Sequence, residues 1–413
     1  MSFTTFEARG GESWAAVARS VYGTDTGSRR IAQANPGLSE PLPAGVRVQV
    51  PPRDGDPRPL PRTGDGGPEE VEVRIAGERF RWWESVTIRR SIDNVDELSL
   101  SAPFEPDRPE FRRAFRPFSY SACAVAIGGD LVFSGTMLAV NPAATPDGVS
   151  VAAGAYSFPG VLADCTPSPE AESLEFLDLN LDQITRELLE PFGLRVAFEG
   201  AAVPGPRFAD VSISVAEPVL PFLARLAKQR GLVIGSDPAG RLVYRQSVQT
   251  GAPVAVLRAS ERGPVTSVTP TFRPRQYFSH LTGLEPEIIG TEGGRFTVRN
   301  ERLDAIRPHA FSVPDTEEGG AEAATRAKAG RMFGDAAAYA VELDTWRDPA
   351  GRLWAPNTTV ELDWPSAMIY GRYEFLVRSV ELRATGSERS ATLALVLPGA
   401  YSGEIPGRLP WQD

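Results

Sequence analysis

Few residues of this sequence have the chemistry of a catalytic or metal-binding site. His280 and His309 are its only histidines, and Cys123 and Cys165 are its only cysteines. A histidine zinc site or a Cys-His dyad needs such residues close together, as in H-E-x-x-H or H-x-H patterns, and the sequence contains neither pattern. We therefore predict no metal, no cofactor and no catalytic residue. The two cysteines are expected to be buried free thiols, and a disulfide between them stays an open alternative.

Acidic and glycine-rich segments give no clearer catalytic pattern. The sequence holds 53 Asp and Glu residues, and a catalytic carboxylate pair among them stays open because none stands in a recognisable local frame. The segments IGGD, EGGR and EEGGAE lack the glycine spacing of phosphate-binding loops and are predicted to be turns. Tryptophans in strand-rich segments belong to cores or interfaces more often than they stack on sugars. The chain is thus predicted not to be an enzyme.

Composition and charge narrow the class of protein. The 37 Pro and 39 Gly residues, with 42% hydrophobic residues, favour a turn-rich and mainly β globular protein. A net charge of -10 argues against specific nucleic-acid binding, because phosphate contacts need clustered Lys and Arg. Residues 1–52 hold five Arg and four acidic residues, so they carry +1 and the remainder carries -11. The N-terminus lacks the basic-then-apolar order of a secretory signal, so we expect synthesis and first residence in the cytoplasm.

The chain is predicted to divide into five segments. A Pro/Gly-rich run, PPRDGDPRPLPRTGDGGP, has almost nothing to bury and predicts a linker. Alternating apolar residues predict strands on both sides of a helical region, with a β-hairpin across Gly128-Gly129. The expected segments are 1–52, a small N-terminal domain; 53–68, the linker; 69–165, a first β-barrel; 166–252, an α+β insertion; and 253–405, a second β-barrel.

Helical periodicity marks the insertion. Leu181, Ile184 and Leu188 share one face of a helix, and Asn180 with Gln183 has the spacing of a capping box. A helix-Gly-strand pattern follows, and it recurs with a period of 38 residues, which predicts two such units in tandem.

A further helix is predicted within the second barrel, over residues 321–333. Glu317 and Glu318 suit its N-terminus, where acidic side chains complement the helix dipole. Gly334 suits its C-cap.

The first 52 residues resemble a LysM module. The resemblance runs through ARGGESWAAVARSVYGT, RIAQANPG and LPAGVRVQVPP, in that family's strand, helix, helix, strand order. It implies a LysM-like βααβ domain that binds a glycan, such as peptidoglycan, along two loops. Trp14 replaces the commoner Leu, and Glu12-Ser13 the commoner Asp-Thr, so we expect glycan binding to be weak or unused. The implied glycan-binding residues are Gly11, Glu12, Ser13, Trp14, Asn35, Pro36, Gly37 and Leu38.

Residues 69 to about 402 resemble the baseplate hub proteins of contractile phage tails, the group of the phage Mu hub, the late control D proteins and the T4-type hub. Three stretches carry the resemblance: VTIRRSIDNVDELSLSAPF, LDQITRELLEPFGLRV, and the segment from GRLWAPNTT to VLPGAY. It implies a homotrimer in which each chain supplies two tube-type β-barrels with an α+β insertion. Such a ring adapts a six-fold tail tube to a three-fold spike. The implied partners are the tail tube protein, the spike protein and other baseplate proteins.

The sequence leaves two functions open. The favoured one is a structural baseplate hub of a contractile phage tail or phage-like injection particle, located in the virion tail baseplate after assembly in the host cytoplasm. The alternative is a peptidoglycan-binding, tail-associated cell-wall hydrolase. Aromatic residues near strand ends are enriched at interface cores, although packing inside their own barrel is the competing expectation. The candidate subunit contacts are Trp354, Trp364, Tyr370 and Tyr373.

Overall fold

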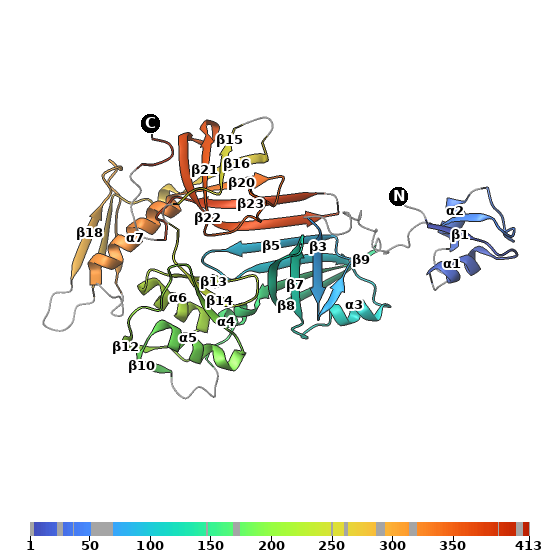
Figure 1. Cartoon of the computed structure of the whole chain (residues 1–413), viewed down its shortest axis with the longest axis horizontal. Helices are drawn as coiled ribbons and strands as arrows, with labels where there is room; N and C mark the ends of the chain where they lie inside the picture. The colour runs from blue at the N-terminus through green and yellow to red at the C-terminus, as the bar shows by residue number, and fades with distance from the viewer. Residues whose placement is uncertain are drawn as a thin grey trace.

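The computed structural model describes residues 4–22, 28–35, 37–50, 69–145, 148–167, 174–248, 251–259, 263–285, 294–313, 320–386, 388–401 and 408–412. The linker predicted over 53–68 and the helix-start residues Glu317 and Glu318 lie outside these ranges. The fold is mainly β, as predicted, with several sheets (Figure 1). Across these ranges, no helix has the length and apolar character needed to cross a membrane.

The N-terminal unit is a small two-stranded sheet with two helices (Figure 1). Its elements are β1 (Thr4–Glu7), α1 (Trp14–Tyr22), α2 (Ser28–Ala34) and β2 (Arg47–Val50), and β1 pairs antiparallel with β2. Val17 and Ile31, one from each helix, are fully buried against Val48 and Val50 of β2. The unit therefore has an apolar core of its own.

The first β unit contains seven antiparallel strands in the order β5-β6-β9-β8-β7-β3-β4. The predicted hairpin is present, since β7 and β8 pair across Gly128 and Gly129, whose φ angles are 59° and 87°. Positive φ at both turn positions favours glycine. Its elements are β3 (Val71–Ile75), β4 (Glu78–Phe80), β5 (Ser85–Ser91), β6 (Glu97–Pro103), α3 (Pro109–Ala114), β7 (Ala122–Ile127), β8 (Asp130–Thr145) and β9 (Gly148–Ser157).

The second β unit contains six strands in the order β16-β20-β23-β22-β21-β15. Neighbouring strands are antiparallel, except that β15 and β21 are parallel. Its strands are β15 (Ala255–Arg258), β16 (Val265–Phe272), β20 (Ala337–Leu343), β21 (Thr359–Trp364), β22 (Ile369–Thr385) and β23 (Arg389–Val396).

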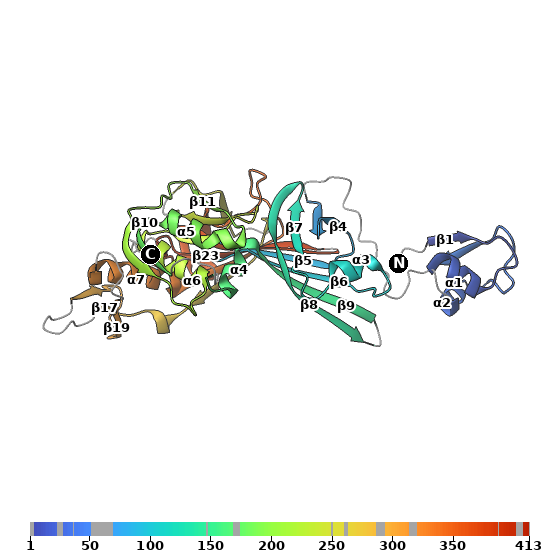
Figure 2. The same ribbon diagram turned by 90° about the horizontal axis from the view of Figure 1, so that it is seen from below.

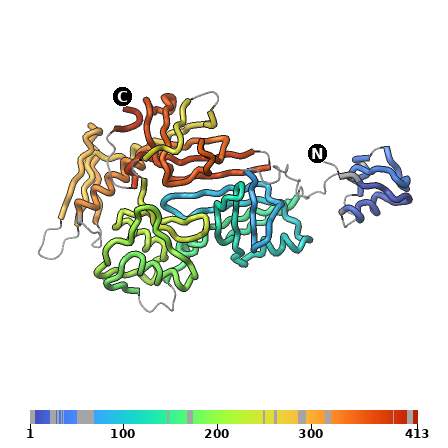
Figure 3. The backbone as a smooth tube through the Cα atoms, in the orientation of Figure 1, coloured from blue at the N-terminus to red at the C-terminus, as the bar shows by residue number. Residues whose placement is uncertain are grey.

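One long strand, β22, joins the two β units into a single sheet. Its first part pairs with β21, and its second part pairs with β23 on one side and with β5 of the first unit on the other. The β5 ladder runs from Ser379 opposite Ser91 to Thr385 opposite Ser85. Leu382 faces Ile88 in this ladder, and each side chain is 1% exposed within one core that spans both units. Figure 3 shows the two units lying side by side along this seam.

The middle unit, between the two β units in sequence, has its own apolar core. The predicted capping box is present, because Asn180 Oδ1 accepts the Gln183 N–H and Gln183 Oε1 accepts the Asn180 N–H, both at 3.0 Å. After each main helix a glycine with positive φ, Gly193 or Gly231, leads into a strand. Its main elements are α4 (Val161–Asp164), β10 (Glu175–Leu179), α5 (Leu181–Leu189), β11 (Val196–Glu199), β12 (Phe208–Ser212), α6 (Val219–Gln229), β13 (Val233–Ser236) and β14 (Leu242–Arg245).

A further three-stranded sheet lies within the predicted second barrel, between β16 and β20 in sequence. It contains β17 (His280–Leu284), β18 (Arg295–Arg299) and β19 (Pro308–Ser312), and α7 (Gly320–Ala336) packs against it. The C-cap predicted at Gly334 was wrong, because the helix continues to Ala336. A Cβ at Gly334 would lie 2.1 Å from the Cβ of Ala400. Glycine is thus used here for close packing and not to end the helix.

The pairing of β5 with β22 is expected to contribute strongly to the free energy of unfolding of the two β units. Leu382→Ala removes a side chain that is buried against both β units, so we expect it to lower the free energy of unfolding by about 2–5 kcal/mol. The neighbouring Glu381→Ala, which changes the opposite face of the same strand, is expected to stay within about 0.5 kcal/mol of the native protein. Urea unfolding measures both, and equal effects of the two substitutions contradict a buried seam.

Candidate functional site

The structure describes seven of the eight residues implied for glycan binding, and Pro36 lies outside its ranges. Several of their polar groups are used inside the N-terminal unit. Glu12 forms a β-bridge with Leu42 and accepts the Arg9 N–H at 2.8 Å through its carboxylate. Ser13 Oγ accepts the Ala16 N–H at 3.2 Å in the first turn of α1. The seven are Gly11, Glu12, Ser13 and Trp14 between β1 and α1, and Asn35, Gly37 and Leu38 after α2.

Asn35 has a structural role that its predicted role did not include. Its side chain is 7% exposed, and its Nδ2 donates to the carbonyls of Ile31 at 2.8 Å and Gln49 at 2.6 Å. Its Oδ1 accepts the Gln49 N–H at 2.8 Å. These bonds tie the end of α2 to β2. A substitution of Asn35 therefore changes the fold of the unit as well as any ligand contact.

The four candidate subunit contacts occupy different environments. Trp354 is 2% exposed in the main core and donates from Nε1 to the Thr345 carbonyl at 3.1 Å, so it packs inside its own unit and is not available to a neighbour. Trp364 and Tyr373 are half-buried against the same core. Only Tyr370 is exposed, at 44%.

Tyr370 borders an open apolar hollow of about 530 Å³ at the end of β16. The sequence did not predict this feature, because its lining comes from segments that are far apart in the chain. The lining residues are Phe272, Arg273, Pro274, Tyr277, Ala336, Met368, Tyr370 and Trp411.

The histidines and cysteines form no reactive group. Cys123 and Cys165 are free thiols, which removes the disulfide alternative, and burial raises the pKa of Cys123 to about 12. His280 lies on β17 and His309 on the neighbouring β19, where its ring stacks on Phe278 with centroids 4.5 Å apart. No cluster of three His, Cys, Asp or Glu side chains suited to a metal ion occurs in the described ranges.

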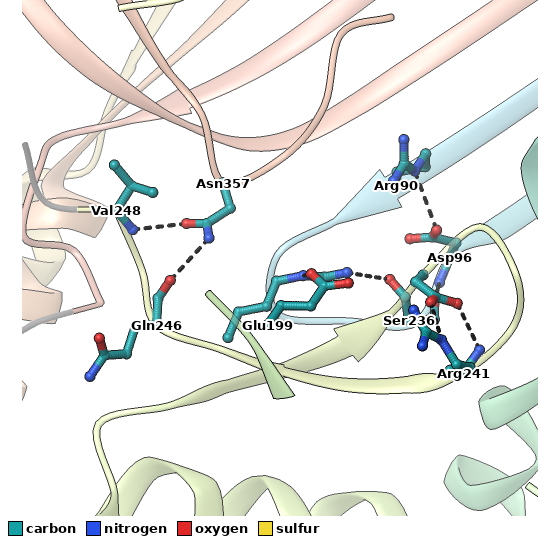
Figure 4. A network of polar contacts seen from close by, with 10 residues as sticks. Arg90, Asp96, Glu199, Ser236, Arg241, Gln246, Val248 and Asn357 are labelled. Atoms are coloured by element: carbon teal, nitrogen blue, oxygen red, sulfur yellow. Dashed lines mark hydrogen bonds and ion pairs between the residues drawn. The ribbon is translucent and has the colours of Figure 1, made fainter. Parts of the chain in front are cut away.

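A polar network ties the first β unit to the middle unit (Figure 4). Asp96, between β5 and β6, is 1% exposed, and its backbone N–H donates to Ser236 Oγ on β13 at 2.8 Å. Its carboxylate accepts the Ser91 N–H at 3.3 Å and faces Arg90, with 3.5 Å between Oδ2 and Nε. Ser157 Oγ also donates to Ser236 Oγ at 2.8 Å. Ser236 is therefore the point where the two units are joined.

Burial controls the electrostatics of this network. It raises the pKa of Asp96 to about 6, against the opposing effects of Arg90, the Ser91 N–H and Arg245. Arg245 is 8% exposed and donates to the Ser236 carbonyl at 2.9 Å and to Glu199 at 2.6 Å. The buried carboxylate thus lies among two guanidinium groups, which suits a fixed structural contact.

The side chain of Asn357 links the middle unit to the second β unit through hydrogen bonds (Figure 4). Asn357 Oδ1 accepts the Val248 N–H at 2.9 Å, and Asn357 Nδ2 donates to the Gln246 carbonyl at 3.0 Å. Its own backbone N–H donates to the Val377 carbonyl at 2.9 Å. Asn357 has a φ of 62°, a left-handed conformation that asparagine tolerates better than most residues.

A second polar group lies on the seam itself. Asp93 accepts from Arg378 at 3.1 Å and from the Tyr401 hydroxyl at 2.7 Å. Arg378 also pairs with Asp335 at the end of α7, with 3.6 Å between the charged atoms. Burial and the Asp93 carboxylate raise the pKa of Tyr401. Hollows of about 420 Å³ and 230 Å³ flank this group, and Asp93 and Arg378 line both of them.

Asp96 gives the junction a defined pH dependence. Its pKa in the folded protein is about 6, above its ordinary value of 3.8, so its contribution to stability is complete below pH 3.8 and is lost as the pH rises through 6. We expect the native protein to lose up to roughly 3 kcal/mol relative to Asp96→Asn between pH 4 and 7. Urea unfolding across that range measures the difference. Glu97→Gln, at an exposed neighbour, is the control, and an unchanged pH profile in Asp96→Asn contradicts the assignment.

Comparison with known proteins matches two segments of the chain to families. A family described as "Baseplate hub protein gp44-like, second domain" matches residues 159–246, which cover most of the middle unit. "Phage Tail Protein X" matches residues 4–53, which include the N-terminal unit.

Comparisons over most of the chain also match baseplate hub and tail proteins. "Baseplate hub protein gp44" of Escherichia phage Mu is 26% identical over 332 residues, covering 76% of this chain and 83% of the relative. A 43 kDa tail protein of prophage MuSo2 from Shewanella oneidensis matches with a TM-score of 0.69 and 26% identity, over 80% of this chain and 99% of that one. A tail protein from Neisseria meningitidis MC58 shares the fold, with a TM-score of 0.68 and 18% identity over 81% and 98% of the two chains.

These relatives are structural hub and tail proteins and not enzymes, which confirms the prediction that the chain is not an enzyme and goes against the cell-wall hydrolase alternative. The chain is a homologue of the phage Mu baseplate hub protein gp44 and a relative of phage tail proteins.

Proposed function

We propose that the protein is the structural baseplate hub of a contractile phage tail or phage-like injection particle. Three copies form a ring that adapts a six-fold tail tube to a three-fold spike. Its partners are the tail tube protein, the spike protein and other baseplate proteins, and it is located in the virion tail baseplate after assembly in the host cytoplasm. The similarity to gp44 over 76% of the chain supports the hub assignment.

An internal repeat of the β unit supports the proposed ring. The order β5-β6-β9-β8-β7-β3 in the first β unit matches the order β16-β20-β23-β22-β21-β15 in the second, although β3 is antiparallel to β7 and β15 is parallel to β21. Both β8 and β22 have a register shift against their neighbour, between Met137 and Ala139 in one and between Val377 and Ser379 in the other. Coincident irregularities in matching strands are typical of repeated units, because bulges are specific features of a fold.

The repeat would let a ring of three chains match both a six-fold tube and a three-fold spike. Two equivalent β units in each of three chains give six, which suits a six-fold tube. The middle unit and the α7 sheet occur once in each chain, so three copies of each suit a three-fold spike. Closed rings of this kind are built from head-to-tail contacts between identical chains.

The N-terminal unit is proposed to be a LysM-like accessory that serves assembly and binds glycan weakly or not at all. Its order of strand, helix, helix and strand supports the LysM-like proposal, and its match to Phage Tail Protein X supports a role within a tail. The internal bonds of Glu12, Ser13 and Asn35 leave these groups less available for a ligand.

The ring predicts the mass of the protein in solution. Size exclusion with light scattering is expected to give about 134 kDa at micromolar concentration, three times the 44.6 kDa of one chain. A monomer at that concentration, with no trimer in the assembled particle, contradicts the ring and leaves the homology unaffected.

The accessory role predicts little retention on purified peptidoglycan. The full chain and a chain without residues 1–52 are expected to sediment with peptidoglycan to the same small extent, because the remaining -11 charge gives no attraction to an anionic wall. Strong retention that the truncation abolishes contradicts this role and assigns glycan binding to the N-terminal unit.

A further inference from the structure

We propose that the sheet of one copy continues into the next through an antiparallel pairing of β8 with β16. The pairing has the register that β22 and β5 have within the chain. This inference rests on the proposed ring and specifies its subunit boundary.

The repeat identifies the two strands. Within the chain, the second half of β22 receives β5 along its outer edge. The strand equivalent to β22 is β8, and the strand equivalent to β5 is β16. Beyond Met137, β8 pairs only with β9, and β16 pairs only with β20, among the strands that the structure describes. The repeat therefore leaves one open edge of each kind, and each is the partner that the other lacks.

The internal ladder fixes the register of the external one. The β8–β9 and β22–β23 registers match residue by residue beyond the shift, and so do the β5–β6 and β16–β20 registers. Ser379 opposite Ser91 then becomes Ala139 opposite Arg273, and Thr385 opposite Ser85 becomes Thr145 opposite Ser267. The pairs between these ends are Val140 with Phe272, Asn141 with Thr271, Pro142 with Pro270, Ala143 with Thr269, and Ala144 with Val268.

The composition of both edges fits this occupant. Residues 137–145 (MLAVNPAAT) and 265–272 (VTSVTPTF) contain no charged residue. Proteins usually protect open edges with charged side chains or with proline. Both edges lack charge and each holds a single proline, so most of their length stays suited to pairing with another chain. Figure 2 shows β8 and β9 extending together away from the first β unit.

The apolar hollow adjoins the same boundary. It lies at the end of β16 and is lined in part by Phe272, Pro274 and Tyr370. The proposed register places Leu138, which is 38% exposed, beside Pro274. Val140 and Val268 already pack against the main core of their own units, so the pairing extends that core across the boundary, as Leu382 and Ile88 do within the chain.

The boundary differs from the internal seam at one rung. The Ile92 N–H donates to the Arg378 carbonyl at 2.9 Å, and hydrogen-bonded rungs alternate in an antiparallel ladder, so Ile88 and Leu382 occupy a hydrogen-bonded rung. Pro142 and Pro270 stand at the equivalent rung, and neither has an N–H to donate. The boundary therefore lacks two hydrogen bonds that the seam makes, which weakens pairing of the edges before assembly.

Disulfide trapping tests the register. Ala143 and Thr269 are exposed and would face each other at a non-hydrogen-bonded rung, where Cα atoms lie about 4.5 Å apart. The chain with Ala143→Cys and Thr269→Cys, in a Cys165→Ser background, is expected to give covalent dimers and trimers after mild oxidation on non-reducing gels. Each single variant is expected to stay monomeric, and an equal mixture of the two is expected to give dimers without trimers.

Two matched pairs control the experiment. Thr87→Cys with Arg383→Cys is the equivalent pair inside the chain, and it is expected to lose both thiols without a change in covalent mass. Ala139→Cys with Thr269→Cys is displaced by four residues, about 13 Å along the strand, and is expected not to cross-link.

The outcomes separate the boundary from the ring. A trimer by mass in which the internal pair forms and the 143/269 pair does not overturns the proposed register and leaves the ring intact. Cross-linking of either single variant alone indicates a two-fold contact and overturns the head-to-tail pairing. A chain that is monomeric and forms no intermolecular cross-link overturns both.

Discussion

The two β units are assembled around the pairing of β22 with β5. It turns two β units into one sheet and buries Leu382 against Ile88 in one continuous core. The relative orientation of the two units is fixed by backbone hydrogen bonds and not by a flexible linker. In the proposed ring, the contact between copies would repeat the contact within the chain, so neighbouring β units would meet at the same angle throughout.

The middle unit is held to this sheet by directional polar contacts, beside an apolar cluster in which Val233 packs against Ile92 and Leu376. Ser236 receives the Asp96 N–H and the Ser157 hydroxyl, while Asn357 holds the other side through two backbone groups. Directional bonds of this kind define an orientation, and the desolvated Asp96 makes the contact dependent on pH. In the proposed hub, these contacts would hold the middle unit, which occurs once in each chain, against a sheet that contains two β units.

Sequence patterns predicted the local features and missed the long-range ones. The hairpin at Gly128-Gly129 and the capping box at Asn180 depend on a few adjacent residues, and both are present. Gly334 was misassigned because its constraint, the close approach of Ala400, comes from a distant segment. The β5–β22 pairing was not predicted, since alternating apolar residues show that a strand exists and not which strand is its neighbour. The presence of two similar β units was implied by the hub resemblance and not by any local pattern. For the same reason no local pattern pointed to Asp96, whose partners lie on other elements of the chain.

We infer that one kind of edge contact joins β units both within and between chains. A density map of the assembled ring, at a resolution that separates strands, would show whether this is so. We expect an unbroken sheet across each subunit boundary, with β8 beside β16 and Pro142 opposite Pro270. A boundary formed by other strands, or a gap in the sheet between copies, would contradict it.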